Sequence, residues 1–183
     1  MRLTAVRRDR RTFDGVLTRL TSGTAVALRP IRPDDKPLLQ EAMTHVSHES
    51  LRLRFLAPKP RLTGSDLRYL TELDEVDHYA MVAVLADRPD AIIGVARWIR
   101  DAAEPASAEV AVLVGDDFHG QGLGTQLGLA VADAARERGI ARFTATMLGE
   151  NIAAHRLFER ISQRLVVTHD GALDEVVAEL LAA

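Results

Sequence analysis

The sequence predicts one α/β (α+β) domain with a mixed, mostly antiparallel central sheet of six to seven strands flanked by about four helices. Three observations favour this fold. Apolar segments of strand length follow one another in the middle of the chain, joined by connections too short for a crossover. Two later segments have the 3.6-residue period of amphipathic helices. An apolar strand also runs into a glycine-rich turn that leads straight into the first of these helices.

Composition limits the possible classes of protein. The 183 residues, 47% of them hydrophobic, suit one domain with a sizeable core. No apolar run approaches the roughly 20 residues of a membrane span, and a net charge of −3 argues against nucleic-acid binding. Cysteine is absent, which excludes disulfides and a thiolate nucleophile. We expect a cytoplasmic protein, and its preference for arginine over lysine is typical of GC-rich bacteria.

The N-terminal quarter divides into an arm and the start of the domain. Residues 1–22 are expected to form a polar arm, and residues 23–183 the domain. The arginine cluster at residues 7–11 either contacts an anionic surface or, as we favour, is solvated. A first strand is predicted at residues 24–32, and a helix from there to about His45, with acidic residues in its first turn.

The middle of the chain alternates between short helices and strands. Helices are expected at residues 47–56 and 65–73, because two prolines separate them. Three strands follow, at residues 78–86, 91–99 and 107–114, and their short connections predict antiparallel pairing.

The last third returns to helices and ends in a hairpin. A helix begins at Gly122 and ends near Gly139, a plausible C-cap; its apolar face comprises Leu123, Leu127, Ala130, Val131 and Ala134. A strand at residues 142–147 and an amphipathic helix at 151–161 come next. The final hairpin is predicted to pair residues 164–168 with 173–180.

The glycine-rich turn predicts a phosphate cradle. Gly120, Gly122 and Gly124 allow a ligand to approach the main chain at a helix N-terminus. A P-loop would need a lysine before Thr125, and the dinucleotide fingerprint would need a different glycine spacing. Both cofactor classes are therefore disfavoured.

The segment His119-Gly120-Gln121-Gly122-Leu123-Gly124 resembles the Gln/Arg-x-x-Gly-x-Gly/Ala motif of the GNAT superfamily of N-acyltransferases, with histidine in place of Gln or Arg. The predicted order of elements is also similar over about residues 24–180. The resemblance implies a sheet splayed between the fourth and fifth strands, with acetyl-CoA in the gap and no metal. It implies cofactor contacts from the following residues: Val112, Leu113, Val114, His119, Gly120, Gln121, Gly122, Leu123, Gly124, Thr125, Asn151 and Phe158.

A second segment, Asn151 to Phe158, resembles the family's Asn-x-x-Ala-x-x-Leu-Tyr helix. Asn151 is either a cofactor contact or simply a helix N-cap, and the two roles can coexist. Residues 28–35, 48–55 and 108–114 are more narrowly similar to bacterial Pat-type protein lysine acetyltransferases. That similarity implies a protein lysine as acceptor, such as that of an acyl-CoA synthetase; a small amine is the second expectation, and a homodimer is possible.

Glu109 is the candidate general base, because it is a carboxylate within the otherwise apolar strand 107–114. It would accept a proton from the acceptor ammonium through a water molecule, and the Pat-type resemblance implies a glutamate here. The alternative is an exposed residue or an ion-pair partner. A free N–H of Leu113 or Val114 is the candidate oxyanion donor.

Phe158 stands where the family has its tyrosine acid, so the standard proton donor is missing. His155, Tyr79 or water could replace it, although His155 is favoured as an exposed helix residue and Phe158 as a packing residue. The missing acid keeps open a second hypothesis, a catalytically weak acyl-CoA sensor. The group His45, His48 and Glu49 does not predict a metal site, because a convincing third ligand is missing. Trp98 fits either the core or the substrate cleft.

Overall fold

The computed structural model describes residues 15–56 and 61–181, so the arginine cluster at residues 7–11 lies outside the described residues. They form an eight-stranded sheet in the order β1-β2-β3-β4-β5-β6-β8-β7. The strands are β1 Val16–Arg19, β2 Ala25–Pro30, β3 His78–Leu85, β4 Ile92–Arg100, β5 Ser107–Val114, β6 Arg142–Leu148, β7 Ser162–Asp170 and β8 Leu173–Leu180.

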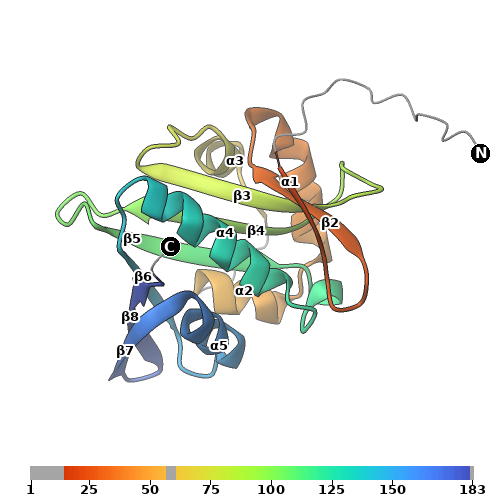
Figure 1. Ribbon diagram of the computed structural model, residues 1–183. Coiled ribbons are helices and arrows are strands. Elements are labelled where there is room, and N and C mark those ends of the chain that lie inside the picture. Colours follow the sequence, from red (N-terminus) through yellow and green to blue (C-terminus); the bar gives the residue numbers. More distant parts are fainter. Residues whose placement is uncertain (1–14, 57–60, 182–183) are drawn as a thin grey trace, which may run out of the picture.

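Five α-helices cover the two faces of the sheet (Figure 1). They are α1 Lys36–Ala42, α2 His48–Phe55, α3 Gly64–Thr71, α4 Leu123–Glu137 and α5 Ile152–Ile161, with short 3-10 turns at Pro33–Asp35, Met43–His45 and Asp116–Phe118. None of the helices in the described part of the chain combines the length and apolar character needed to cross a membrane.

The predicted architecture is confirmed, with one additional strand. β1 lies within the segment expected to be a polar arm, and it pairs antiparallel with β2. Val16 and Leu17 remain largely exposed, whereas Leu20 just after them is buried. A single buried side chain leaves little apolar pattern, which is why the sequence did not indicate this edge strand.

The sheet separates two hydrophobic cores. On one face α4 and α5 pack on β3–β6 and β8, around residues such as Leu127, Phe143 and Trp98. On the other face α1, α2 and α3 pack over β2–β5, around residues such as Leu39 and Val82. Alternate residues of one strand therefore belong to different cores, as strand geometry requires.

β5 and β6 are the only parallel neighbours in the described sheet, and they stay together for three residue pairs. Pairing runs from Ser107–Arg142 to Glu109–Thr144 and then stops, although β5 continues to Val114. The predicted splay between the fourth and fifth expected strands is thus present, and one edge of β5 is left without a strand partner among the described residues.

A buried ion pair fixes the entry to α1. Asp35 accepts two hydrogen bonds of 2.7 Å from the Arg29 guanidinium and one of 2.8 Å from the Arg32 N–H. Both charged side chains are at most 10% exposed. A buried pair of this geometry is costly to break, because the remaining charge stays buried without a partner.

We expect Asp35→Ala to lower the free energy of unfolding by about 3 kcal/mol or more, since Arg29 would be left unpaired. Urea titration followed by circular dichroism measures this. The matched control is Glu72→Gln, which removes the more exposed pair with Lys36 and should cost less than about 1 kcal/mol. Equal losses in the two variants would contradict the role given to the buried pair.

Candidate active site

The glycine loop has the backbone shape of an anion cradle. Gly120 (φ +70°) and Gly122 (φ +84°) occupy the left-handed region, which side chains larger than hydrogen disfavour. Gly122 is the N-cap of α4, and no side chain caps this helix. The first N–H groups of α4 therefore have neither an intrahelical partner nor a side-chain cap, and they carry the positive end of the helix dipole.

Neighbouring segments hold this loop in place. His119 Nε2 donates to the Val114 carbonyl (2.9 Å), so the residue that departs from the family motif ties the loop to the end of β5. The Thr21 N–H donates to the Gln121 carbonyl (3.1 Å). Gln126 Nε2 in α4 donates to the carbonyl of Arg19 at 2.9 Å. The sequence did not indicate these contacts from the β1–β2 connection, because they join residues about a hundred positions apart.

The register of β5 decides which backbone groups face the gap. The Gly115 N–H donates to the Ile93 carbonyl of the β4 side (2.9 Å). Because these bonds recur at every second residue of an antiparallel pair, Leu113 also directs its N–H at β4. Val112 and Val114 lie between these positions and direct their backbone groups at the open side. Of the two candidate oxyanion donors, Val114 directs its N–H at the gap and Leu113 directs its N–H at β4, so the register favours Val114.

Glu109 lies at the apex of the splay, in the last residue pair that joins β5 to β6. Its neighbours Ala108 and Val110 are buried on the α4 side, whereas Glu109 is exposed and lies on the face that carries α2. No ion pair within 4.0 Å of Glu109 is found among the described residues. Its charge is nevertheless felt by Arg54 of α2: burial lowers the pKa of Arg54, and Glu109 acts in the opposite direction.

Helix α2 spans the opening below the apex. At its start, Asp116 after β5 accepts hydrogen bonds from the Ser47 N–H (2.8 Å) and the Ser50 hydroxyl (2.7 Å). Burial tends to raise the pKa of Asp116, but these hydrogen bonds outweigh it and lower that pKa. One turn later, Arg52 pairs with Glu150 in the loop between β6 and α5. α2 therefore connects the two strands that the sheet leaves apart.

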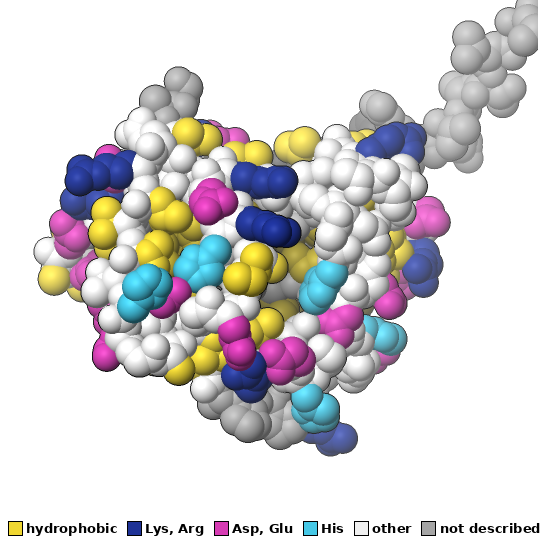
Figure 2. Space-filling model, turned by 90° about the horizontal axis from the view of Figure 1, so that it is seen from below, with side chains coloured by type: hydrophobic (Ala, Val, Ile, Leu, Met, Phe, Trp, Pro, Cys, Tyr) yellow, Lys and Arg dark blue, Asp and Glu magenta, His cyan; other side chains and the backbone are white. Residues whose placement is uncertain are grey.

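The surface on this side is recessed near its centre, with Lys or Arg side chains at the rim and hydrophobic side chains inside (Figure 2). Two hollows are also found, one of about 550 Å³ beside Gly139 and Leu180 and one of about 440 Å³ beside Leu39, Leu113 and Asp116, at the end of β5. Neither is lined by Glu109, so the candidate site is located by the point where β5 and β6 part.

Asn151 and Phe158 occupy structural positions in α5. The Asn151 side chain accepts a hydrogen bond from the Ala154 N–H (3.1 Å), which is an N-cap. Phe158 is 4% exposed and belongs to the core under α4 and α5, as expected for a packing residue. Tyr79 is buried on β3, separated from β5 by β4, so it does not replace the missing tyrosine.

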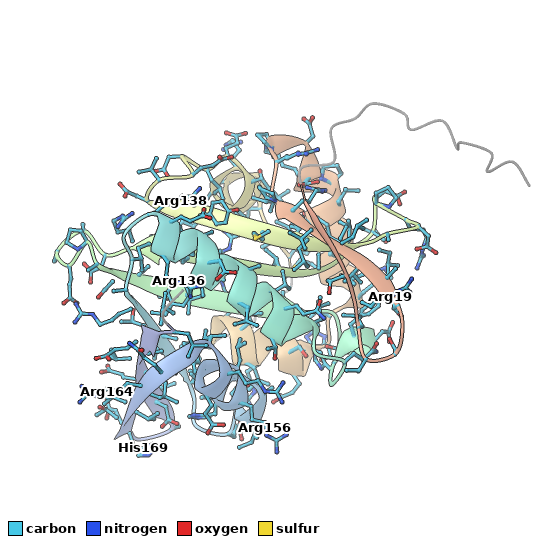
Figure 3. The ribbon with its side chains drawn as sticks, in the orientation of Figure 1. Arg19, Arg136, Arg138, Arg156, Arg164 and His169 are labelled. Carbon is cyan, nitrogen blue, oxygen red and sulfur yellow. The ribbon has the colours of Figure 1, made fainter. Side chains whose placement is uncertain are left out.

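His155 differs from the expected exposed helix residue. Its Nε2 lies 2.9 Å from Asp174 of β8, and its side chain is 21% exposed. The buried Asp174 also contacts His169 Nδ1 at 2.6 Å. Figure 3 shows His169 on β7, at the far end of the C-terminal hairpin from α4. His155 therefore ties α5 to the hairpin, on the side of β6 away from the gap.

The structure also decides the position of Trp98, which the sequence left open. Trp98 is fully buried and stacks on Tyr79 with ring centroids 5.7 Å apart, so it belongs to the core and not to the cleft. Within residues 15–56 and 61–181, no three His, Asp or Glu side chains are arranged to hold a metal ion. The sequence analysis missed Arg97, a charged residue in the apolar strand β4, although the same signal identified Glu109.

Comparison with known proteins agrees with this geometry. The model of the acetyltransferase (GNAT) domain matches residues 26–162. The acetyltransferase Pat of Mycolicibacterium smegmatis is 34% identical over 134 residues, which are 73% of this chain and 40% of that protein. The chain thus spans less than half of this curated relative.

Solved structures show the same relationship. The GNAT domain of S. lividans PAT superposes with a TM-score of 0.82 at 31% identity, covering 92% of this chain and 98% of that one. A cAMP-binding acyltransferase from Mycobacterium smegmatis gives a TM-score of 0.65 at 27% identity, covering 92% of this chain and 48% of that one. The family model, the splayed sheet and the uncapped glycine loop lead to one conclusion: the chain belongs to the acetyltransferase (GNAT) domain family.

Proposed function

We propose that the protein transfers an acetyl group from acetyl-CoA to a primary amine, by direct attack of the amine on the thioester. The observation that carries this proposal is the position of Glu109 at the point where β5 and β6 separate. Acetyl-CoA is the co-substrate and supplies the thioester. The residues of the chain that would bind it lie on the α4 face of the gap, and Glu109 lies on the opposite face.

The glycine loop suits the pyrophosphate of the cofactor. Its free N–H groups at the start of α4 would bind the phosphate oxygens, and Gly120 and Gly122 leave the backbone accessible. The open edge of β5 suits the pantetheine arm, because the backbone groups of Val112 would pair with its amides as with a further strand. The Val114 N–H is placed to stabilise negative charge on the thioester oxygen.

Glu109 suits the role of general base. A primary ammonium has a pKa near 10.4 and must lose a proton before it attacks. An exposed carboxylate at the apex of the gap attracts this cation and accepts its proton, directly or through a water molecule. The thiolate would leave without a protein acid, since Phe158 has no proton to give; a thiol pKa of about 8.5 makes this tolerable.

A protein lysine is the first candidate for the acceptor, because Pat-type acetyltransferases are among the similar proteins, and a small amine is the second. We also propose that the reaction takes place in the cytoplasm, which suits a cysteine-free protein of this composition. A homodimer is proposed as the oligomeric state. The alternative function is an acyl-CoA sensor with weak activity, which the buried Phe158 in place of an acid favours.

Glu109→Gln should lower kcat at neutral pH by about 100-fold or more, because the carboxylate that accepts the proton is removed. A thiol-release assay on peptides and polyamines measures kcat, and calorimetry should give an acetyl-CoA Kd within about twofold of the unmodified protein.

Glu175→Gln is the matched control for that experiment, since Glu175 is also an exposed glutamate of the sheet but lies on β8, outside the gap. It should keep full turnover. Unchanged turnover in Glu109→Gln would reject Glu109 as the base. Background thiol release across the whole acceptor panel, with acetyl-CoA still bound, would favour the sensor.

Gly122→Val should raise the Kd for acetyl-CoA by more than tenfold. A valine strains the backbone at φ +84°, at a cost of about 1–2 kcal/mol, and relief of this strain would displace the N–H groups of the loop. Gly139→Val is the control, because Gly139 has a similar left-handed φ of +76° but lies after the far end of α4, outside the glycine loop. Calorimetric titration of both variants tests this, and a retained affinity in folded Gly122→Val would place the phosphates elsewhere.

A further inference from the structure

Two arginines lie beside Glu109 on the acceptor face of the sheet. Arg97 of β4 is the cross-strand partner of Ala111, and Glu109 is the partner of Ile99. Because side chains two residues apart share a face, Arg97 and Glu109 are diagonal neighbours on one face. Arg54, in the last turn of α2, interacts electrostatically with both of them.

Arg97 is buried without a negative partner. It is 5% exposed, and its guanidinium donates to His78 Nε2 (3.1 Å) and to the Leu70 carbonyl (3.2 Å). In the described part of the chain, no carboxylate lies within 4.0 Å of Arg97 or Arg54. The contrast with Arg29 is direct, since that buried guanidinium has a bidentate carboxylate in Asp35.

The neighbouring groups do not supply the missing charge. Burial, together with Arg97, lowers the pKa of His78 to about 4, so its ring is neutral at pH 7 and accepts the hydrogen bond. Burial and then the charge of Arg54 lower the pKa of Arg97 to about 10, which still leaves it protonated. Two cations therefore face one exposed carboxylate, Glu109.

An unpaired buried charge is expensive, and proteins usually provide it with a partner. We propose that Arg54 and Arg97 form a carboxylate-binding subsite beside Glu109, so that the acceptor carries a carboxylate close to the amine that is acetylated. Arg54, which is partly exposed, contacts the carboxylate, and Arg97 adds its charge from beneath. A guanidinium fork matches the two oxygens of a carboxylate.

This inference rests on the proposed function, because it places the acceptor at Glu109. It also specifies the acceptor as a zwitterion, with its ammonium at Glu109 and its carboxylate at Arg54. The carboxylate has two possible sources, a free amino acid or an acidic residue beside a lysine in a protein. Both present the same chemistry to the arginines.

The test compares acceptors that differ only in this charge: L-lysine with L-lysinamide, and an Asp-Lys peptide with its Asn-Lys counterpart. Binding to the CoA-loaded protein is measured by calorimetry, and kcat/KM by thiol release. We expect the carboxylate member of at least one pair to be favoured by about tenfold or more, as for a charge-assisted hydrogen bond. Preference within the lysine pair assigns a free amino acid, and preference within the peptide pair assigns a protein.

Arg54→Gln should reduce that preference to near one, whereas Arg68→Gln, which removes an exposed arginine of α3, should keep it. Arg54 is chosen because substitution of the buried Arg97 could unfold the protein, and each variant's Tm is checked. Preferences near one in both pairs, a preference retained in Arg54→Gln, or competition by inorganic phosphate but not by glutarate would each overturn the proposal. Carboxylate-selective binding without any acetylation would uphold the subsite and reject the proposed function.

Discussion

The structure depends on the short length of the parallel ladder between β5 and β6. Three residue pairs hold the two halves of the sheet together, and beyond them no strand of residues 15–56 and 61–181 pairs with the free edge of β5. Unpaired backbone groups of this kind are normally a liability. Here they lie between the glycine loop on one face and Glu109 on the other, so the interruption brings these two parts of the candidate site to the same edge of β5.

The features that could be predicted from the sequence are those that a local pattern of apolar and turn residues encodes. β5 was expected at residues 107–114 and has those bounds, because its apolar residues are framed by a loop and a glycine turn. The choice between Leu113 and Val114 needed the hydrogen-bond register with β4, which no local pattern contains. β1 was missed for a related reason: its pairing with β2, and not its own side chains, keeps it in place.

Charged residues in apolar strands had to be judged by their partners. The sequence singles out Glu109 in β5 and passes over Arg97 in β4, although both interrupt an apolar run. Only the folded chain shows that Arg29 has its counter-charge and Arg97 does not. An arginine therefore stabilises the fold at position 29 and leaves a positive potential at position 97. The difference is set by contacts between helices and strands that lie far apart in sequence.

Helix α2 has a mechanical consequence for the gap. Its two polar attachments, to Asp116 and to Glu150, are solvent-accessible, and water can replace them at small cost. β5 and β6 are thus connected by weak polar contacts through α2 at one end and by the parallel ladder at the other. β5 and β6 are therefore held firmly where they pair and can separate more easily at their other ends. A ligand arm lying along β5 would take the place of the missing neighbouring strand. Occupancy of the gap should then be linked to the stability of the whole sheet, so that a ligand bound along β5 should raise the free energy of unfolding.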